Sequence, residues 1–190
     1  MLFTWLGSLF SSSKSSSTPT VPSNIWTTQY STGVPRTFTD TFFFPPSDGV
    51  HYVVRRAPEV REGNVISLTF SLEGTGTLVP TKELTSIPRI RLYLQQKGDT
   101  LTASEPYKRW WSTNNIELLS PGVYTLRTQV TSSQWSSVFG KNGSEVPSEY
   151  LKCISNLGHI GFTFGGSFAG HGVYASSGQV TFKVIEFSIL

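Results

Sequence analysis

The sequence predicts an all-β protein, an antiparallel β-sandwich of jelly-roll type with two short helices and an extended N-terminal arm. Composition is the first reason, because charged residues make up 14% and aromatic residues 13%, while Ser, Thr and Gly are abundant. This profile is typical of short strands joined by polar turns. Pattern is the second reason, since roughly eight segments read as strands between Gly, Pro and Asn turn signals. The length of 190 residues accommodates one domain with a sizeable core.

Residues 1–23 are predicted to be an N-terminal arm and linker, and residues 24–190 the sandwich domain. Residues 1–10 are apolar but too short to cross a bilayer, so no membrane span is predicted. No Lys or Arg precedes them and no clear cleavage site follows, as a signal peptide would require. Residues 11–23 form a Ser/Thr/Pro linker that cannot bury a core. We expect the arm to dock on a neighbouring subunit, with an uncleaved leader as the alternative. Its docking side chains are Leu2, Phe3, Trp5, Leu6, Leu9 and Phe10.

The strands of the first two thirds follow this linker. Residues 25–44 are rich in Thr, Tyr and Phe and predict an opening strand and hairpin, with residues 50–55 as its return. Residues 65–72 alternate strictly, which makes them the clearest strand in the chain. Their inward side chains are Ile66, Leu68, Phe70 and Leu72. Further strands are predicted at residues 89–95, 107–112, 116–118 and 123–130.

Two short helices are predicted between the late strands. Residues 131–134 match a capping box, in which two side chains bond the first free backbone N–H groups, and Gly140 ends this helix. Residues 146–157 carry apolar side chains at helical spacing before the terminating Gly158. Both helices are expected to cover an open edge or end of the sandwich.

The last third is a glycine-aromatic run over residues 161–174 followed by an apolar strand over residues 179–190. Phe162 and Phe164 alternate with Thr163, which indicates a strand. We expect this strand and the terminal one to close the sandwich as its final pair, with a shaped loop between them. The inward set shifts between Val184 and Ile185, which predicts a β-bulge.

Charge and cysteine content restrict the function. The net charge is only +3, and Lys and Arg are scattered apart from the doublets at residues 55–56 and 108–109. Such doublets are expected to be solvated, and no basic stripe tracks a phosphate backbone, so no nucleic-acid partner is predicted. Cys153 is the single cysteine, which excludes an intrachain disulfide and favours assembly inside a cell or stabilisation by a core or by oligomerisation. Cys153 itself is expected to be a small buried apolar residue.

No cofactor, metal ion or catalytic residue is predicted. His159 and His171 have no carboxylate or Cys at metal-ligand spacing, and His51 is far away in the chain. The sequence contains no nucleophile elbow, phosphate-binding loop or dinucleotide fingerprint. Glu105 and Glu117 flank a Trp-rich strand and are the candidates if the protein is a glycan hydrolase or lyase. Two solvated rim carboxylates are the favoured interpretation, and we predict that the protein is not an enzyme.

Aromatic side chains are the remaining candidates for a binding site. Trp110 and Trp111 fall on opposite faces of their strand, so one is expected in the core and the other partly exposed. An exposed ring stacks on a sugar or anchors a protein interface, whereas core packing is the alternative for each ring. The candidates for contact with a glycan or partner are Trp110, Trp111, Phe168, His171 and Tyr174.

Several of these segments together resemble a group of small β-sandwich proteins of bacteria and their tailed bacteriophages, similar in strand layout to carbohydrate-binding modules. The resemblance rests on residues 107–112, 117–126, 131–140, 161–166 and 170–174, and covers about residues 50–190. It implies a virion structural protein, a tail- or capsid-associated decoration or adhesion subunit that assembles in the host cytoplasm. Its implied partners are other virion proteins, further copies of the chain and a host glycan. The alternative is a bacterial lectin-like module that is secreted or displayed at the cell surface.

Overall fold

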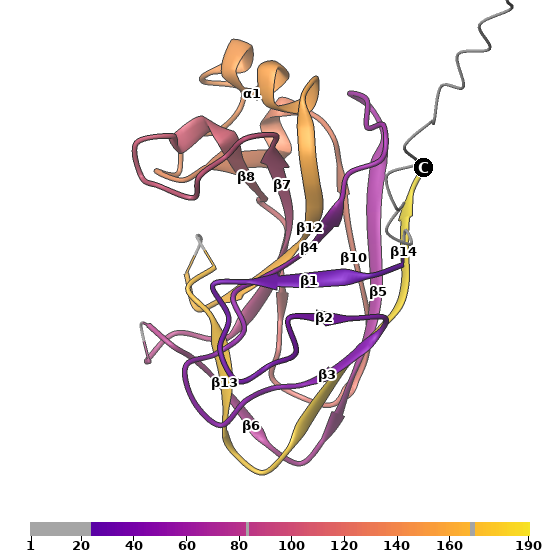
Figure 1. The fold of residues 1–190 in the computed structure, drawn as a ribbon, viewed down its shortest axis with the longest axis vertical. Helices are drawn as coiled ribbons and strands as arrows, with labels where there is room; N and C mark the ends of the chain where they lie inside the picture. Colours follow the sequence, from indigo (N-terminus) through magenta and orange to yellow (C-terminus); the bar gives the residue numbers. More distant parts are fainter. Residues whose placement is uncertain (1–23, 83, 168–169) are drawn as a thin grey trace, which may run out of the picture.

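The computed structural model describes residues 24–82, 84–167 and 170–190 as a sandwich of two antiparallel sheets (Figure 1). This confirms the predicted all-β fold class. The predicted docking arm, with Leu2, Phe3, Trp5, Leu6, Leu9 and Phe10, lies outside the described residues, as does Phe168.

The larger sheet has eight strands in the order β11-β8-β7-β12-β4-β1-β2, with β9 pairing beside the first residues of β7. Alternation along β7 sends Ile90, Leu92 and Leu94 into the interior and places Tyr93 on the other face. The strands of this sheet are β1 (Trp26–Gln29), β2 (Thr37–Phe38), β4 (Tyr52–Arg56), β7 (Arg89–Gln96), β8 (Arg109–Ser112), β9 (Ile116–Glu117), β11 (Trp135–Ser137) and β12 (Leu157–Gly165).

The smaller sheet has four strands in the order β10-β5-β14-β3. Its register shifts between Val184 and Glu186 of β14, which confirms the predicted bulge. The four predicted inward residues of β5 are all buried. The strands are β3 (Thr41–Phe43), β5 (Val65–Gly74), β10 (Gly122–Gln129) and β14 (Val180–Ile189), and β6 (Thr77–Pro80) pairs separately with β13 (Val173–Ser177).

The expected final pair of strands is wrong in one respect. β12 lies between β7 and β4 of the larger sheet, whereas β14 lies between β5 and β3 of the smaller sheet. The chain therefore crosses from one layer to the other between them, through β13. Both strands are central in their sheets, because each pairs with a partner strand on either side.

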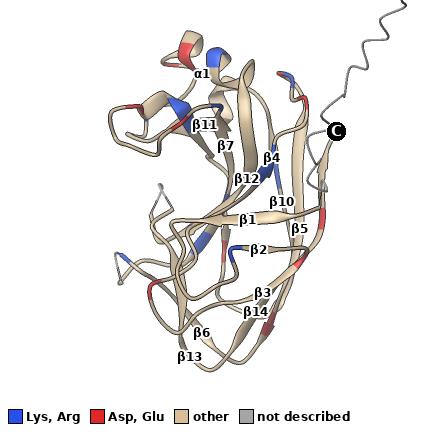
Figure 2. Cartoon of the chain, viewed as in Figure 1, with Lys and Arg blue, Asp and Glu red and all other residues tan. Residues whose placement is uncertain are grey.

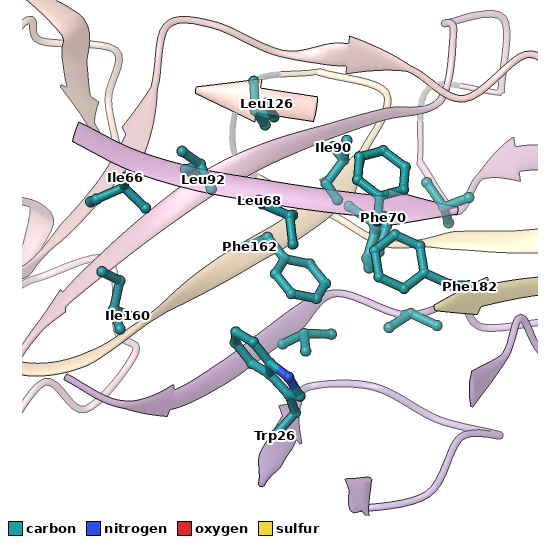
Figure 3. Close-up of a cluster of buried hydrophobic side chains, with 14 of the residues drawn as sticks. Trp26, Ile66, Leu68, Phe70, Ile90, Leu92, Leu126, Ile160, Phe162 and Phe182 are labelled. Carbon is teal, nitrogen blue, oxygen red and sulfur yellow. The ribbon is translucent and has the colours of Figure 1, made fainter. Parts of the chain in front are cut away.

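Aromatic rings from both sheets meet at Phe182 of β14. Its ring centroid lies 4.9 Å from Phe70 and 5.2 Å from Phe42, in stacked geometry. On the side of the larger sheet it lies 5.3 Å from both Phe162 and Phe164. Figure 3 shows Phe70, Phe162 and Phe182 among the aliphatic side chains that fill the space between the layers. Phe182 therefore connects the two halves of the core.

One of the two predicted helices is present. Helix α1 (Pro147–Ile154) packs its buried Tyr150 against Trp110, with ring centroids 5.2 Å apart. The helix predicted from residue 131 is wrong, because a single 3-10 turn (Ser132–Gln134) leads directly into β11. Gln134 Oε1 accepts a hydrogen bond from Gln129 N at 3.0 Å, and Thr131 makes no side-chain cap. Pairing of β11 with β8 outweighs the local capping pattern. No helix in the described ranges is long and apolar enough to cross a bilayer.

Substitution of Phe182 tests the role of this ring. We expect Phe182→Ala to lower the free energy of unfolding by about 3–5 kcal/mol, because it leaves a cavity between the sheets. Phe43→Ala is the matched control, since that ring is 54% exposed on the neighbouring strand, and should change stability by less than about 0.5 kcal/mol. Urea unfolding followed by Trp fluorescence measures both, and equal effects of the two substitutions would contradict the assignment.

Candidate functional site

The face of the larger sheet that points away from the smaller sheet, here called the outer face, carries a second buried cluster. Tyr52, Tyr93 and Trp111 come from β4, β7 and β8 and pack with Val54 and Val138. The ring centroids of Tyr52 and Tyr93 are 5.1 Å apart, and those of Tyr93 and Trp111 are 5.3 Å apart. Aromatic side chains thus form a firm floor on this face.

A buried ion pair fixes the β7–β8 connection beside this floor. Asp99 Oδ2 lies 3.4 Å from Arg109 Nε, and the two side chains are 0% and 6% exposed. Asp99 also accepts hydrogen bonds from Gln95 Nε2 at 2.9 Å and from Leu101 N at 3.2 Å. Arg109 further donates to the carbonyl of Thr102. The expectation that the doublet at residues 108–109 is solvated is therefore wrong for Arg109, because Asp99 compensates its charge inside the protein.

A pocket of about 200 Å³ opens at this place. In Figure 1, the segments that contribute to it project from one side of the larger sheet, from the β7–β8 connection above and from the loops around residues 82 and 170 below. The residues that line this outer-face pocket are Tyr30, His51, Tyr52, Lys82, Leu101, Arg109, Gly170 and His171.

Backbone strain in the described residues is concentrated around the outer-face pocket. Apart from glycines, positive φ angles occur there at Tyr30 (50°), Asp48 (63°) and Leu101 (62°). Tyr30 and Leu101 line the pocket, and the carbonyl oxygen of Asp48 accepts a hydrogen bond from His51 Nε2 at 3.3 Å. Bulky residues rarely adopt this conformation, and such outliers are enriched at functional sites because the fold must hold them there.

Glycines of the late run allow its loop to lie close against the sheet. Gly172 has φ of 97°, and a Cβ at this position would lie 2.5 Å from the His51 ring. A Cβ at Gly170 would lie 2.9 Å from Thr163 Oγ1 of β12. Thr81 N donates to the Gly172 carbonyl at 2.9 Å, which joins this loop to the one that carries Lys82. The glycine-aromatic run thus shapes one wall of the pocket.

Ionisation in the pocket is set mainly by burial. Burial lowers the pKa of His51 below its usual value, and the neighbouring charges of His171 and Lys82 lower it further. Burial raises the pKa of Tyr52, although Arg109 acts in the opposite direction. His51 is therefore neutral at pH 7 and, because Asp48 offers it a carbonyl oxygen, carries a proton on Nε2.

Polar atoms without a partner accompany the aromatic floor. Tyr93 OH, Gln95 Oε1 and Thr163 Oγ1 are buried and form no hydrogen bond within the described part of the chain. A buried polar atom left unpaired costs free energy, so a native fold keeps it only for a reason. No three His, Cys, Asp or Glu side chains among the described residues come close enough to hold a metal ion. None of the three residues that carry the unpaired atoms lines the outer-face pocket.

The sequence-predicted contact residues separate in the structure. His171 lines the pocket, whereas Trp111 is 1% exposed in the buried outer-face cluster and does not line the pocket. Trp110 is buried on the opposite face, with Nε1 donating to the Tyr107 carbonyl at 2.8 Å. The expectation that one Trp is partly exposed is therefore wrong, because β8 is covered on both faces. Tyr174 is half-buried in β13 opposite Val79 and does not line the pocket.

Glu105 and Glu117 do not form a pair of carboxylates. Glu117 accepts from Arg89 Nη2 at 2.9 Å at the start of β7, whereas Glu105 pairs with Lys108 near the other end. The strand positions concerned, 89 and 95, are six residues apart, which corresponds to about 20 Å along β7. Two-carboxylate glycoside hydrolysis needs a separation of roughly 5–9.5 Å. This observation removes the proposed hydrolase pair.

Six pocket residues were not identified as site residues from the sequence. Tyr30, Tyr52, Lys82 and Leu101 carry no motif, and their proximity follows only from strand order and loop conformation. His51 and Arg109 carry side chains that are common in binding sites, but the sequence shows no partner residue for either of them. The glycine run was the one usable signal, and it led to His171.

Removal of the Asp99 charge tests the ion pair that fixes the pocket wall. We expect Asp99→Asn to lower the free energy of unfolding by about 3–5 kcal/mol, because Arg109 then remains buried without a counter-charge. Asp40→Asn is the control, since Asp40 is exposed and its loss should cost less than about 0.5 kcal/mol. Thermal unfolding at pH 7 measures both variants, and an unchanged Asp99→Asn protein would exclude a structural role for the pair.

Comparison with known proteins adds no family to this description. No protein-family model, no curated protein and no solved structure matches the chain.

Proposed function

We propose that this chain is a non-enzymatic adhesion or decoration subunit of a bacteriophage virion whose sandwich domain binds a saccharide in the outer-face pocket. The observation that carries the binding part is the pocket itself. It joins an exposed aromatic ring, polar groups and strained backbone at one place on a rigid sheet.

Tyr30 provides the aromatic surface of the proposed site. Its side chain is 64% exposed at the pocket, with its ring centroid 6.4 Å from that of the buried Tyr52. A sugar ring has an apolar C–H face that packs on such a ring, while its hydroxyl groups need hydrogen-bond partners. Lys82, His51 and His171 supply these around the same opening. A sugar that stacks one face on Tyr30 and forms hydrogen bonds from its hydroxyl groups to these side chains satisfies both requirements.

The size of the pocket favours a single terminal sugar residue. Its volume of about 200 Å³ is below the roughly 300–1,000 Å³ of pockets that enclose drug-sized ligands. The lining residues include no Asp or Glu in the described part of the chain. Binding without hydrolysis is the function that this set of side chains supports best.

The virion part of the proposal is supported by the sequence. The segments between residues 107 and 174 resemble β-sandwich proteins of tailed phages, and the apolar residues 1–10 have the composition of a docking arm. A bacterial lectin-like module, secreted or at the cell surface, would use the same pocket. The virion subunit and the lectin-like module differ in whether the N-terminal arm attaches the domain to a particle.

Glycan binding tests the site. We expect the full chain to bind a subset of glycans on an array, and Tyr30→Ala to weaken that binding by roughly three- to tenfold through loss of stacking. Phe139→Ala is the matched control, because this aromatic side chain is equally exposed and does not line the pocket. Absence of binding to every glycan, or equal losses in both variants, would rule the site out.

Deletion of residues 1–20 tests the docking arm. We expect the shortened chain to fold, because the described sandwich begins at residue 24, and to be missing from purified particles that contain the full chain. Quantitative mass spectrometry of the particles and circular dichroism of the shortened protein give the two readouts. Normal incorporation of the shortened chain would contradict the arm's role and leave saccharide binding unaffected.

A further inference from the structure

We infer that the outer-face pocket selects a saccharide with an anionic group, a carboxylate or a sulfate ester, and that Lys82 recognises this group. The inference rests on the proposed saccharide-binding function and specifies the chemical class of its ligand.

The charge of the pocket lining is the first argument. Its titratable side chains, apart from tyrosines, are His51, Lys82, Arg109 and His171, all cationic when protonated. Basic residues elsewhere are interspersed with acidic ones over both sheets (Figure 2). Because His51 is neutral at pH 7 and Asp99 compensates Arg109, the exposed Lys82 is the charged group that a ligand in this pocket meets.

Two carboxylates beside these groups accept hydrogen bonds from other residues. Asp99 is buried against Arg109 and also accepts from Gln95 and Leu101. Asp48 approaches His51 through its backbone carbonyl, while its carboxylate accepts from Ser47 Oγ at 3.3 Å. In the described part of the chain, neither carboxylate forms an ion pair with Lys82. An anion supplied by the ligand would do so.

Proximity of the basic groups in the pocket is the second argument. His51, Lys82 and His171 line the same opening, and burial together with the nearby His171 and Lys82 lowers the pKa of His51. Gly172 packs directly on the His51 ring and holds it in place. A concave opening with an exposed Lys82 and no Asp or Glu among its described lining residues favours a ligand of negative charge.

Lys82 is the residue through which this preference can be changed without unfolding the protein. Its side chain is exposed, whereas Arg109 is buried in an ion pair that the fold requires. A charge-assisted hydrogen bond from Lys82 to a carboxylate is stronger than one to a neutral hydroxyl, which corresponds to about tenfold in affinity.

Matched acidic and neutral ligands provide the test. The full chain is screened on an array that holds uronic acids, sialic acids and sulfated sugars beside their neutral counterparts. The tightest acidic glycan is then titrated by calorimetry against its methyl ester, or its desulfated form, and against inorganic sulfate. We expect the acid to bind about tenfold more tightly than the neutral form, and the preference to weaken as salt rises. Comparison of the carboxylated glycans with the sulfated ones identifies which anionic group is recognised.

Variants separate this inference from the proposed function. Lys82→Ala should reduce the preference to less than about threefold while leaving affinity for the neutral form unchanged, and Lys183→Ala, an exposed lysine on β14, should leave the preference intact. Equal affinity for acid and ester, binding of neutral glycans alone, or sulfate binding as tightly as the sugar overturns the inference. Binding of neutral glycans that is weakened by Tyr30→Ala would still support the proposed saccharide binding. A protein that binds no glycan would contradict both the proposed function and the preference for an anionic saccharide.

Discussion

The stacking of Phe182 between rings of both sheets is the contact on which the sandwich depends. Each sheet alone buries one apolar face, and that face is covered only when the other layer packs on it. Phe70 and Phe42 approach Phe182 from its own sheet, while Phe162 and Phe164 approach from the opposite one. The strands that supply these rings are central in their sheets, apart from β3 at the edge. Packing at one point therefore fixes the distance between the layers along most of their length.

The outer face is formed by side chains of the larger sheet that point away from this core. Because β4, β7 and β8 alternate, the residues between their core positions are placed on the outer face with the packed core behind them. This firm floor allows the loops to hold unusual backbone at Tyr30, Asp48 and Leu101, which an isolated loop would relax. The Asp99–Arg109 pair adds a polar anchor where the β7–β8 connection crosses the edge of the pocket. The outer-face pocket and the hydrophobic core thus lie on opposite faces of the larger sheet.

Local pattern was sufficient for much of the fold. Alternation predicted the inward residues of β5, the bulge in β14 and the apolar spacing of α1, since each is a property of a few neighbouring residues. The helix expected from Thr131 failed because strand pairing with β8 is not visible locally. The pocket could not be predicted from the sequence for the same reason, because Tyr30, Leu101 and His171 are distant in sequence. Burial of Arg109 depends on Asp99, and only the tertiary structure brings that partner close.

The position of β14 has a consequence for synthesis of the protein. This strand of ten residues follows all the other described strands in sequence, yet it lies between β5 and β3 and supplies Phe182. A nascent chain that still holds residues 180–189 inside the ribosome keeps one edge of β5 unpaired and the core open. Unpaired edges are templates for association with other chains, and late long-range pairing is slow. The sandwich is therefore completed only after β14 itself has emerged, and until then the unpaired edge of β5 is open to association with other chains.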